Sequence, residues 1–547
     1  MLTDIEIAQQ ATLIPIDQLA KKIGLKEEEF IPYGRDKAKV EIDTSNPKGK
    51  LILVTATSGM PAGSGKTTTS IALAQALQKL GESACLALRE PSLGPSFGMK
   101  GGAAGGGYSQ VVPMESINLH FTGDFHAITA ANNLLAALID NAKHQGQVEL
   151  KEVTWRRVLD VNDRSLRDIV TGLGGLANGT PAQTGFDITA ASELMAIICL
   201  ADGESDLRAR LDRLVVGIKK DGSAYTCGEL GATGALMALL KDAMLPNLVQ
   251  TLEGVPAFVH GGPFANIAHG CNSVAATRAA LKLADWAITE AGFGSDLGAE
   301  KFYDIKCRLT GLQPAATVLV TSLKALKWHG GVALPEIGKP NMEALKAGLP
   351  NLRAHIKNLQ NFGQQVVVSL NHFFGDPEDE IEVVRNECKA LGARFAVSDG
   401  FAKGGEGAVD VAKELIEAVK EGSQPLHFAY NLDQTVLEKI QEVNTKVYGG
   451  KDVEFSPAAQ KDLAKIEALG FSNLPICIAK TPFSLSHEPG WKGAPKDFTL
   501  PVQRLILNAG AGFIVVTTGA IMRMPGLPKK PAAYSIDVVN GKFVGLS

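Results

Sequence analysis

The feature that most constrains the fold is an apolar run that enters a glycine-rich turn and then a long helical pattern. The segment LILVTA, residues 51–56, is followed by TSGMPAGSGK and then by apolar residues at helical spacing as far as Gly81. A buried strand that enters a helix in this way can surround a phosphate group with backbone N–H groups and the helix N-terminus. Lys66 supplies an ammonium group, and the Thr67 hydroxyl can reach a Mg²⁺ ion bound to that phosphate.

The turn departs from the GxxxxGK[ST] pattern at its first position, where Met60 replaces glycine. Gly63 and Gly65 still permit the turn, and the strand and helix around it favour a nucleotide site over an ordinary structural turn. A partner-switched ATPase would carry a second lysine at position 61, where this chain has proline. The residues expected to bind ATP are Met60, Pro61, Ala62, Gly63, Ser64, Gly65, Lys66, Thr67 and Thr68.

Seven further apolar runs alternate with long helical patterns, which predicts an α/β fold: a P-loop NTPase-like, mostly parallel sheet flanked by helices. Ligands bind at the carboxyl edge of such a sheet. Arg89 and Glu90 follow the second strand, where an arginine could fork onto a phosphoryl group or simply pair with Glu90. Asp124 follows an expected third strand and could hold Mg²⁺ or its water. The seven runs are SACLALR, INLHFT, VPAFVHG, DWAITEA, ATVLVTS, QVVVSL and ARFAVSD.

The pattern of apolar strands followed by glycine-rich turns stops between residues 143 and 244, which predicts an inserted helical or α+β domain there. Residues 1–142 and 245–450 then form the nucleotide-binding α/β domain. Prolines and short strands after residue 450 predict a small C-terminal α+β domain over 451–547.

Composition argues against several classes of protein. The formal charge of −4 favours neither nucleic acid nor an anionic membrane as a partner. The seven cysteines are scattered without a CxxC pair, which argues against a metal knuckle or a disulfide framework. The N-terminus does not resemble a secretory signal, and no apolar run approaches the ~20 residues that span a bilayer. We therefore expect a cytoplasmic protein.

Several long segments together resemble the formate–tetrahydrofolate ligase family. Examples are PAGSGKTTTSIALAQAL, REPSLGPSFGMKGGAAGGGYSQVVPM, NLVQTLEGVPAFVHGGPFANIAHGCNS and TEAGFGSDLGAEKFYDIKCR, which occur in the family's order. The resemblance implies ATP-dependent ligation of formate to tetrahydrofolate through formyl phosphate, giving 10-formyltetrahydrofolate, ADP and phosphate. The alternatives are another ATP-dependent carboxylate-activating ligase with a different acceptor and, less favoured, a partner-regulated P-loop ATPase.

The resemblance also implies roles for individual residues. Lys66 and Arg89 match a catalytic lysine and arginine that grip the transferred phosphoryl group and formyl phosphate, and Asp124 matches an aspartate beside the reacting groups. Mg²⁺ would accompany ATP, with Thr67 as its protein ligand, and K⁺ or NH₄⁺ would activate a homotetramer. The residues expected to bind folate are Glu90, Phe293, Phe373 and Phe401.

The chain departs from the family pattern at several of these positions. Phe401 stands where the family normally has tryptophan, which reduces the surface available for stacking on the flat folate ring. We expect an active enzyme that has diverged, with weaker folate binding. The other departures are Ser64 in place of glutamate, Ala182 and Gln183 in place of Arg-Glu, and Pro482 and Phe483 in place of Gln-Tyr.

Overall fold

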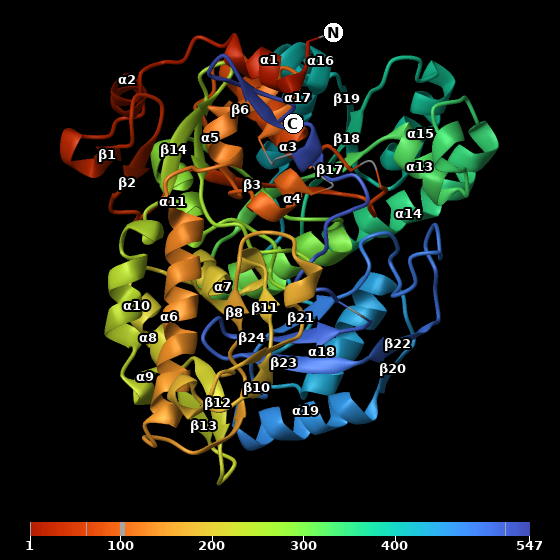
Figure 1. Cartoon of the computed structure of the whole chain (residues 1–547). Helices are drawn as coiled ribbons and strands as arrows, with labels where there is room; N and C mark the ends of the chain where they lie inside the picture. The colour runs from red at the N-terminus through yellow and green to blue at the C-terminus, as the bar shows by residue number, and fades with distance from the viewer. Residues whose placement is uncertain (1, 62, 99–103, 520, 547) are drawn as a thin grey trace.

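The computed structural model of the chain describes residues 2–61, 63–98, 104–519 and 521–546. Within these ranges, a 12-stranded mixed sheet flanked by helices forms the centre of the molecule (Figure 1). Along the sheet lie, in order, β1 (Phe30–Pro32), β2 (Ala38–Val40), β14 (Asn247–Thr251), β15 (Pro256–Val259), β4 (Ala84–Leu88), β16 (Trp286–Glu290), β3 (Lys50–Ala56), β17 (Pro314–Thr321), β18 (Val366–Asn371) and β19 (Arg394–Ser398). The remaining two, β5 (Gly105–Gly106) and β6 (Ser109–Val112), pair with each other, and β6 also pairs with β14.

The half of the sheet that carries the phosphate loop is parallel. All neighbours from β15 to β19 run in the same direction, and β3 lies between β16 and β17. Their carboxyl ends therefore meet at one edge. The strands predicted at these positions are confirmed, as is the α/β class, whereas β1, β2, β6 and β14 add antiparallel pairing that was not predicted.

Side chains of β3 alternate between two buried faces, as the pleat of a strand requires. Ile52 and Val54 pack beneath α3 (Lys66–Lys79) and α17 (Val409–Glu421). Leu51 and Leu53 belong to the core on the opposite face, beside α11 (Val274–Leu283), α13 (Leu323–His329), α14 (Met342–Asn361) and α15 (Glu378–Ala390). A strand buried on both faces explains the continuous apolar run in the sequence.

The expected third strand, INLHFT, is wrong. Its first residues belong to the short helix α5 (Met114–Asn118), and the long helix α6 (Asp124–His144) begins directly after Gly123. Ile117 and Phe121 are buried in the core under α3, so the apolar pattern reflects burial alone. Short apolar runs cannot by themselves distinguish a buried strand from a buried helix.

The segment between α6 and β14 folds into small sheets and helices. It contains β7 (Leu150–Val153), β8 (Arg157–Val158), β9 (Ile169–Thr171), β10 (Ala182–Thr184), β11 (Phe186–Asp187), α7 (Glu193–Leu200), α8 (Glu204–Asp212), β12 (Val215–Lys219), β13 (Ala224–Thr226), α9 (Cys227–Leu230) and α10 (Thr233–Leu240). Its buried side chains share one core with residues near the C-terminus, for example Leu194 with Cys477 and Phe513. Figure 1 shows the two regions side by side below the main sheet.

The C-terminal region holds two further small sheets against helices α18 (Val436–Val443) and α19 (Pro457–Ala468). The last hairpin then returns to the N-terminus, where Gln9 donates to the carbonyl of Phe543 at 3.0 Å. None of the described helices is long and apolar enough to cross a membrane. The strands of this region are β20 (Asp452–Phe455), β21 (Ile476–Ala479), β22 (Thr499–Val502), β23 (Arg504–Asn508), β24 (Phe513–Thr517), β25 (Asp537–Val539) and β26 (Lys542–Val544).

Candidate active site

The predicted phosphate loop connects the carboxyl end of β3 to the first turn of α3. Gly63 and Gly65 have φ values of 83° and 72°, which side chains rarely adopt. At Gly65 a Cβ atom would also lie 2.5 Å from Nδ2 of Asn371, so the Asn371 amide would have to move. The Lys66 Nζ atom, in the first turn of the helix, donates to Ser64 Oγ at 2.9 Å. The loop therefore has the backbone turn and the cation at a helix N-terminus that were predicted.

Met60, the departure from the motif, anchors the loop to a neighbouring helix. Its side chain is buried in a small cluster with Ala325 and Trp328 of α13. The next departure lies beside it: Phe483 packs on the same cluster, and the Pro482 carbonyl accepts a hydrogen bond from Gly59 N at 2.9 Å. Pro61 is exposed, and position 62 lies outside the described residues. Met60 and Phe483, two departures from the expected motifs that are far apart in the chain, thus pack in the same cluster.

Glu290, at the end of β16, links the phosphate loop to the second strand. One carboxylate oxygen accepts from Thr67 Oγ1 at 2.8 Å, and the other lies 3.8 Å from Nη2 of Arg89. The Glu290 side chain is buried. Hydroxyl and carboxylate oxygens are ligands that Mg²⁺ prefers, so Thr67 and Glu290 together fit that ion. Arg89 therefore pairs with Glu290 and not with the neighbouring Glu90, and its binding of a phosphoryl group stays a prediction.

Glu290 and Asn371 were not among the predicted site residues. Asn371 ends β18, accepts from Thr69 Oγ1 at 3.0 Å and donates to the Ser64 carbonyl at 3.4 Å. Both residues are polar groups that close an apolar strand at the ligand edge of the sheet. That signal is present in the sequence, in DWAITE and VVVSLN.

Asp124 was predicted at a strand end, but it lies in the first turn of α6, where it is buried. Its carboxylate pairs with Lys39 Nζ at 2.7 Å and accepts from Asn247 Nδ2 at 2.7 Å. It also lies near Glu90, whose own carboxyl is buried. Burial, reinforced by the charge of Asp124, raises the pKa of Glu90 well above its usual value, with Lys39 opposing. Among the described residues, Oε2 of Glu90 has no hydrogen-bond partner.

The three phenylalanines predicted to bind folate follow strands at the carboxyl edge of the sheet, Phe293 and Phe373 in loops and Phe401 in a short helix. Phe293 follows β16 and has a φ of 62°, which is rare for a residue with a side chain. Phe373 follows β18, is 41% exposed, and has Lys324 Nζ 3.9 Å from its ring centroid. Phe401, in the short helix α16 (Gly400–Lys403), is 53% exposed, and its carbonyl accepts from Tyr108 N at 2.9 Å. The Phe373 and Phe401 rings keep exposed surface at this edge, which suits stacking on a flat ligand.

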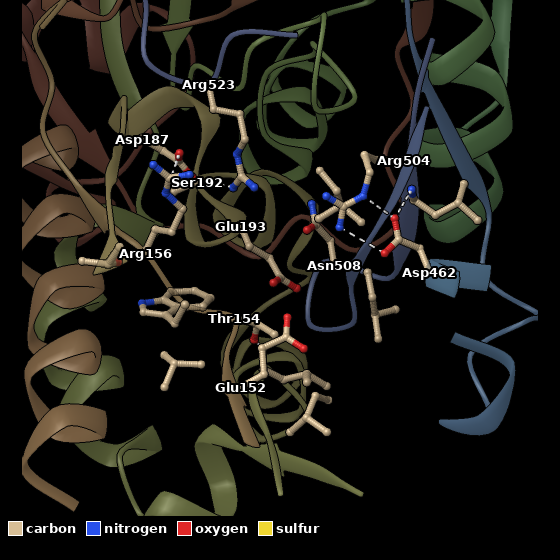
Figure 2. A pocket seen from close by; sticks show the side chains of 18 of the residues that line it. Glu152, Thr154, Arg156, Asp187, Ser192, Glu193, Asp462, Arg504, Asn508 and Arg523 are labelled. Carbon is tan, nitrogen blue, oxygen red and sulfur yellow. Dashed lines mark hydrogen bonds and ion pairs between the residues drawn. The ribbon is translucent and has the colours of Figure 1, made fainter. Parts of the chain in front are cut away.

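A separate cavity of about 620 Å³ lies between the segment after α6 and the C-terminal strands (Figure 2). None of the predicted catalytic, ATP-binding or folate-binding residues lines it; of the departures, Gln183 does. Its charged groups pair with one another: Arg156 and Arg523 both contact Asp187, and Arg504 contacts Asp462 at 2.6 Å. This cavity is therefore distinct from the candidate active site.

Comparisons with known proteins agree with the resemblance seen in the sequence. The family model described as "Formate--tetrahydrofolate ligase" matches residues 2–547. Proteins of that name from Phocaeicola vulgatus and Parabacteroides distasonis are each 54% identical over 555 aligned residues, covering all of this chain and all of each relative. The chain belongs to the formate–tetrahydrofolate ligase family.

Proposed function

We propose that the protein ligates formate to tetrahydrofolate with ATP, giving 10-formyltetrahydrofolate, ADP and phosphate. The observation that carries the proposal is the convergence of Lys66, Thr67, Glu290 and Arg89 at one edge of the sheet, in a chain matched end to end by the family. An ammonium, a guanidinium and two oxygen ligands for Mg²⁺ are the groups that transfer of a phosphoryl group requires.

In this proposal, the formate carboxylate attacks the γ-phosphorus of ATP in line, forming formyl phosphate as ADP leaves. The N10 nitrogen of tetrahydrofolate then attacks the formyl carbon, phosphate departs, and the nitrogen loses its proton. Lys66 and Arg89 neutralise charge on the transferred group, and their work is positioning and electrostatics. Mg²⁺, held by Thr67 and Glu290, would neutralise further charge on the phosphates.

Asp124 is buried, so we assign it a role through Glu90. Its charge adds to the effect of burial in raising the pKa of Glu90, which favours the protonated carboxyl, a form that can donate a hydrogen bond to the acceptor substrate. Phe293, Phe373 and Phe401 would contact the folate ring.

We also propose the domain boundaries predicted from the sequence. They are a P-loop NTPase-like nucleotide domain of residues 1–142 and 245–450, an inserted domain of residues 143–244 and a C-terminal domain of residues 451–547.

A coupled assay that omits each substrate in turn tests the reaction. ADP release should require formate, and 10-formyltetrahydrofolate should form only when ATP, formate and tetrahydrofolate are all present. Release of ADP with formate and no need for tetrahydrofolate would favour a ligase with a different acceptor. Slow ATP hydrolysis independent of both would favour a regulated ATPase.

We also propose a homotetramer that is activated by K⁺ or NH₄⁺ and works in the cytoplasm. Leu173 and Leu176, between β9 and β10, are 65% and 85% exposed, and apolar side chains so exposed suit contacts between copies of the chain. All seven cysteines are buried and free, as suits a reducing compartment. Sedimentation velocity tests the tetramer, and initial rates in potassium, ammonium and tetramethylammonium chloride test the cation.

A further inference from the structure

We propose that His355 is a positioning residue that holds the phosphate loop and the loop carrying Phe293 in a fixed relation. It lies on α14 and is fully buried, beneath the candidate active site. The inference rests on the proposed function, because it gives these two loops the roles of nucleotide and folate subsites.

The hydrogen bonds of His355 fix which ring nitrogen carries the proton. Ser58 N donates to Nε2 at 2.8 Å, and Ser58 Oγ lies 2.9 Å from the same nitrogen. A backbone N–H can only donate, so Nε2 is the acceptor and the proton of the neutral ring is on Nδ1. Nδ1 then donates to Ser295 Oγ at 2.7 Å. One imidazole ring thus accepts from one loop and donates to the other.

Each of these serines lies at the base of a ligand loop. Ser58 is the second residue after β3, where the chain turns into the phosphate loop, and Ser295 is the second residue after Phe293. The loops also lie close together: a Cβ atom added to Gly294 would lie 3.2 Å from the Thr57 carbonyl oxygen. A change in either loop would therefore be transmitted to the other through His355.

Two other side chains also form hydrogen bonds with Ser58. Asn351, one turn earlier on α14, donates to Ser58 Oγ at 3.0 Å, and His329 Nε2 lies 3.2 Å from the Ser58 carbonyl. The N–H, the hydroxyl and the carbonyl of Ser58 are all bonded to side chains. Such a network orients a loop as a unit and is sensitive to the loss of any member.

Burial lowers the pKa of His355 to about 4, with Asp296 opposing and Lys480 reinforcing the shift. A ring with this pKa is neutral near pH 7, as the hydrogen-bond geometry also requires. The role proposed here is geometric and does not require titration.

Two substitutions separate the two halves of this contact. In His355→Gln, the amide oxygen reaches the place of Nε2 and can accept from Ser58, but no atom reaches Ser295. In His355→Asn, the amide reaches the place of Nδ1 and can donate to Ser295, but nothing accepts from Ser58. Ser295→Ala should reproduce the effect of His355→Gln without touching the histidine.

We expect His355→Asn to raise KM for MgATP roughly tenfold, as loss of a buried hydrogen bond would, and to affect KM for tetrahydrofolate less. His355→Gln and Ser295→Ala should instead raise KM for tetrahydrofolate and affect KM for MgATP less. Asn358→Ala is the matched control: one turn beyond His355, Asn358 donates to Val447 O at 2.7 Å, away from both loops. It should lower Tm and leave both KM values unchanged.

The inference is overturned if both His355 variants change the two KM values alike, or change neither. Equilibrium binding of a nonhydrolysable ATP analogue provides a second measurement that does not depend on the reaction. If the wild-type protein makes no 10-formyltetrahydrofolate, the proposed function fails. Weaker binding of the analogue to His355→Asn than to His355→Gln would still support the hold on the phosphate loop, and equal binding would refute it.

Discussion

Replacing Glu290 with glutamine tests whether its charge organises the phosphate-transfer site. Glutamine has the same shape and keeps an oxygen that can accept from Thr67, but it has no charge to attract Arg89 or Mg²⁺. Glu290 is buried at the end of β16, with its oxygens 2.8 Å from Thr67 Oγ1 and 3.8 Å from Arg89 Nη2.

The distances set the size of the expected effect. Two unit charges 3.8 Å apart attract with about 4 kcal/mol at an effective dielectric constant of ~20. The Arg89 side chain is 24% exposed, so water offsets part of this attraction. A loss of about 2 kcal/mol, roughly half of this attraction, corresponds to a roughly 30-fold lower kcat/KM for MgATP.

The assay is formate-dependent ADP release at varied MgATP and varied free Mg²⁺. Glu290→Gln should lower kcat/KM and raise the Mg²⁺ concentration that gives half the maximal rate. Glu82→Gln is the matched control. Glu82 accepts from Nε1 of Trp286 at 2.8 Å, and Trp286 lies at the opposite end of β16 from Glu290. Unchanged kcat/KM and Mg²⁺ dependence in Glu290→Gln would refute the role given to this carboxylate.

Three further changes probe the site and the fold. Lys66→Ala should lower formate-dependent ADP release at least about a hundredfold, whereas Lys79→Ala at the other end of α3 should not, and substantial residual synthesis would reject the role of Lys66. Phe401→Trp should lower KM for tetrahydrofolate by roughly fivefold, because the larger ring stacks over more of the folate; an unchanged KM would place the ring elsewhere. Burial raises the pKa of Glu193 to about 7, so the folded chain binds this proton more tightly than the unfolded chain and loses stability as pH rises from about 4.5 to about 7. Glu193→Gln removes this loss. Its free energy of unfolding relative to wild type should increase by about 2.5 kcal/mol between pH 5 and pH 8 in denaturant titrations, and a constant difference would contradict the shift.

The parallel half of the sheet was predictable because its strands are buried on both faces and end in turn residues. The strand–turn–helix unit around Lys66 carries its own local signature, and the predicted loop and helix match the structure. INLHFT failed because its apolar spacing comes from burial under α3, and its first residues form the end of helix α5. The antiparallel strands β1, β2 and β6 were missed because they are short. β2 and β6 pair with β14, more than a hundred residues away, and β1 pairs with β2.

The site residues that were not predicted from the sequence depend on contacts between segments that are far apart in the chain. Asp124 looked like a strand-end carboxylate, but its partner is Lys39, which no local pattern connects to it. Glu290 and Asn371 carry a weak signal, as polar residues that close apolar strands. His355 carries none, since a histidine in the middle of an amphipathic helix is usually an ordinary core residue. Its importance follows only from the two loops that it contacts.

The most direct test of the account is the structure of the protein crystallised with a nonhydrolysable ATP analogue, Mg²⁺ and formate. The account predicts that the γ-phosphate lies within about 3 Å of Lys66 Nζ, a hydrogen-bonding distance. It also predicts Mg²⁺ beside Thr67 and Glu290, and formate next to Arg89. A triphosphate bound away from Lys66, for example in the cavity beside Arg156 and Arg523, would contradict it.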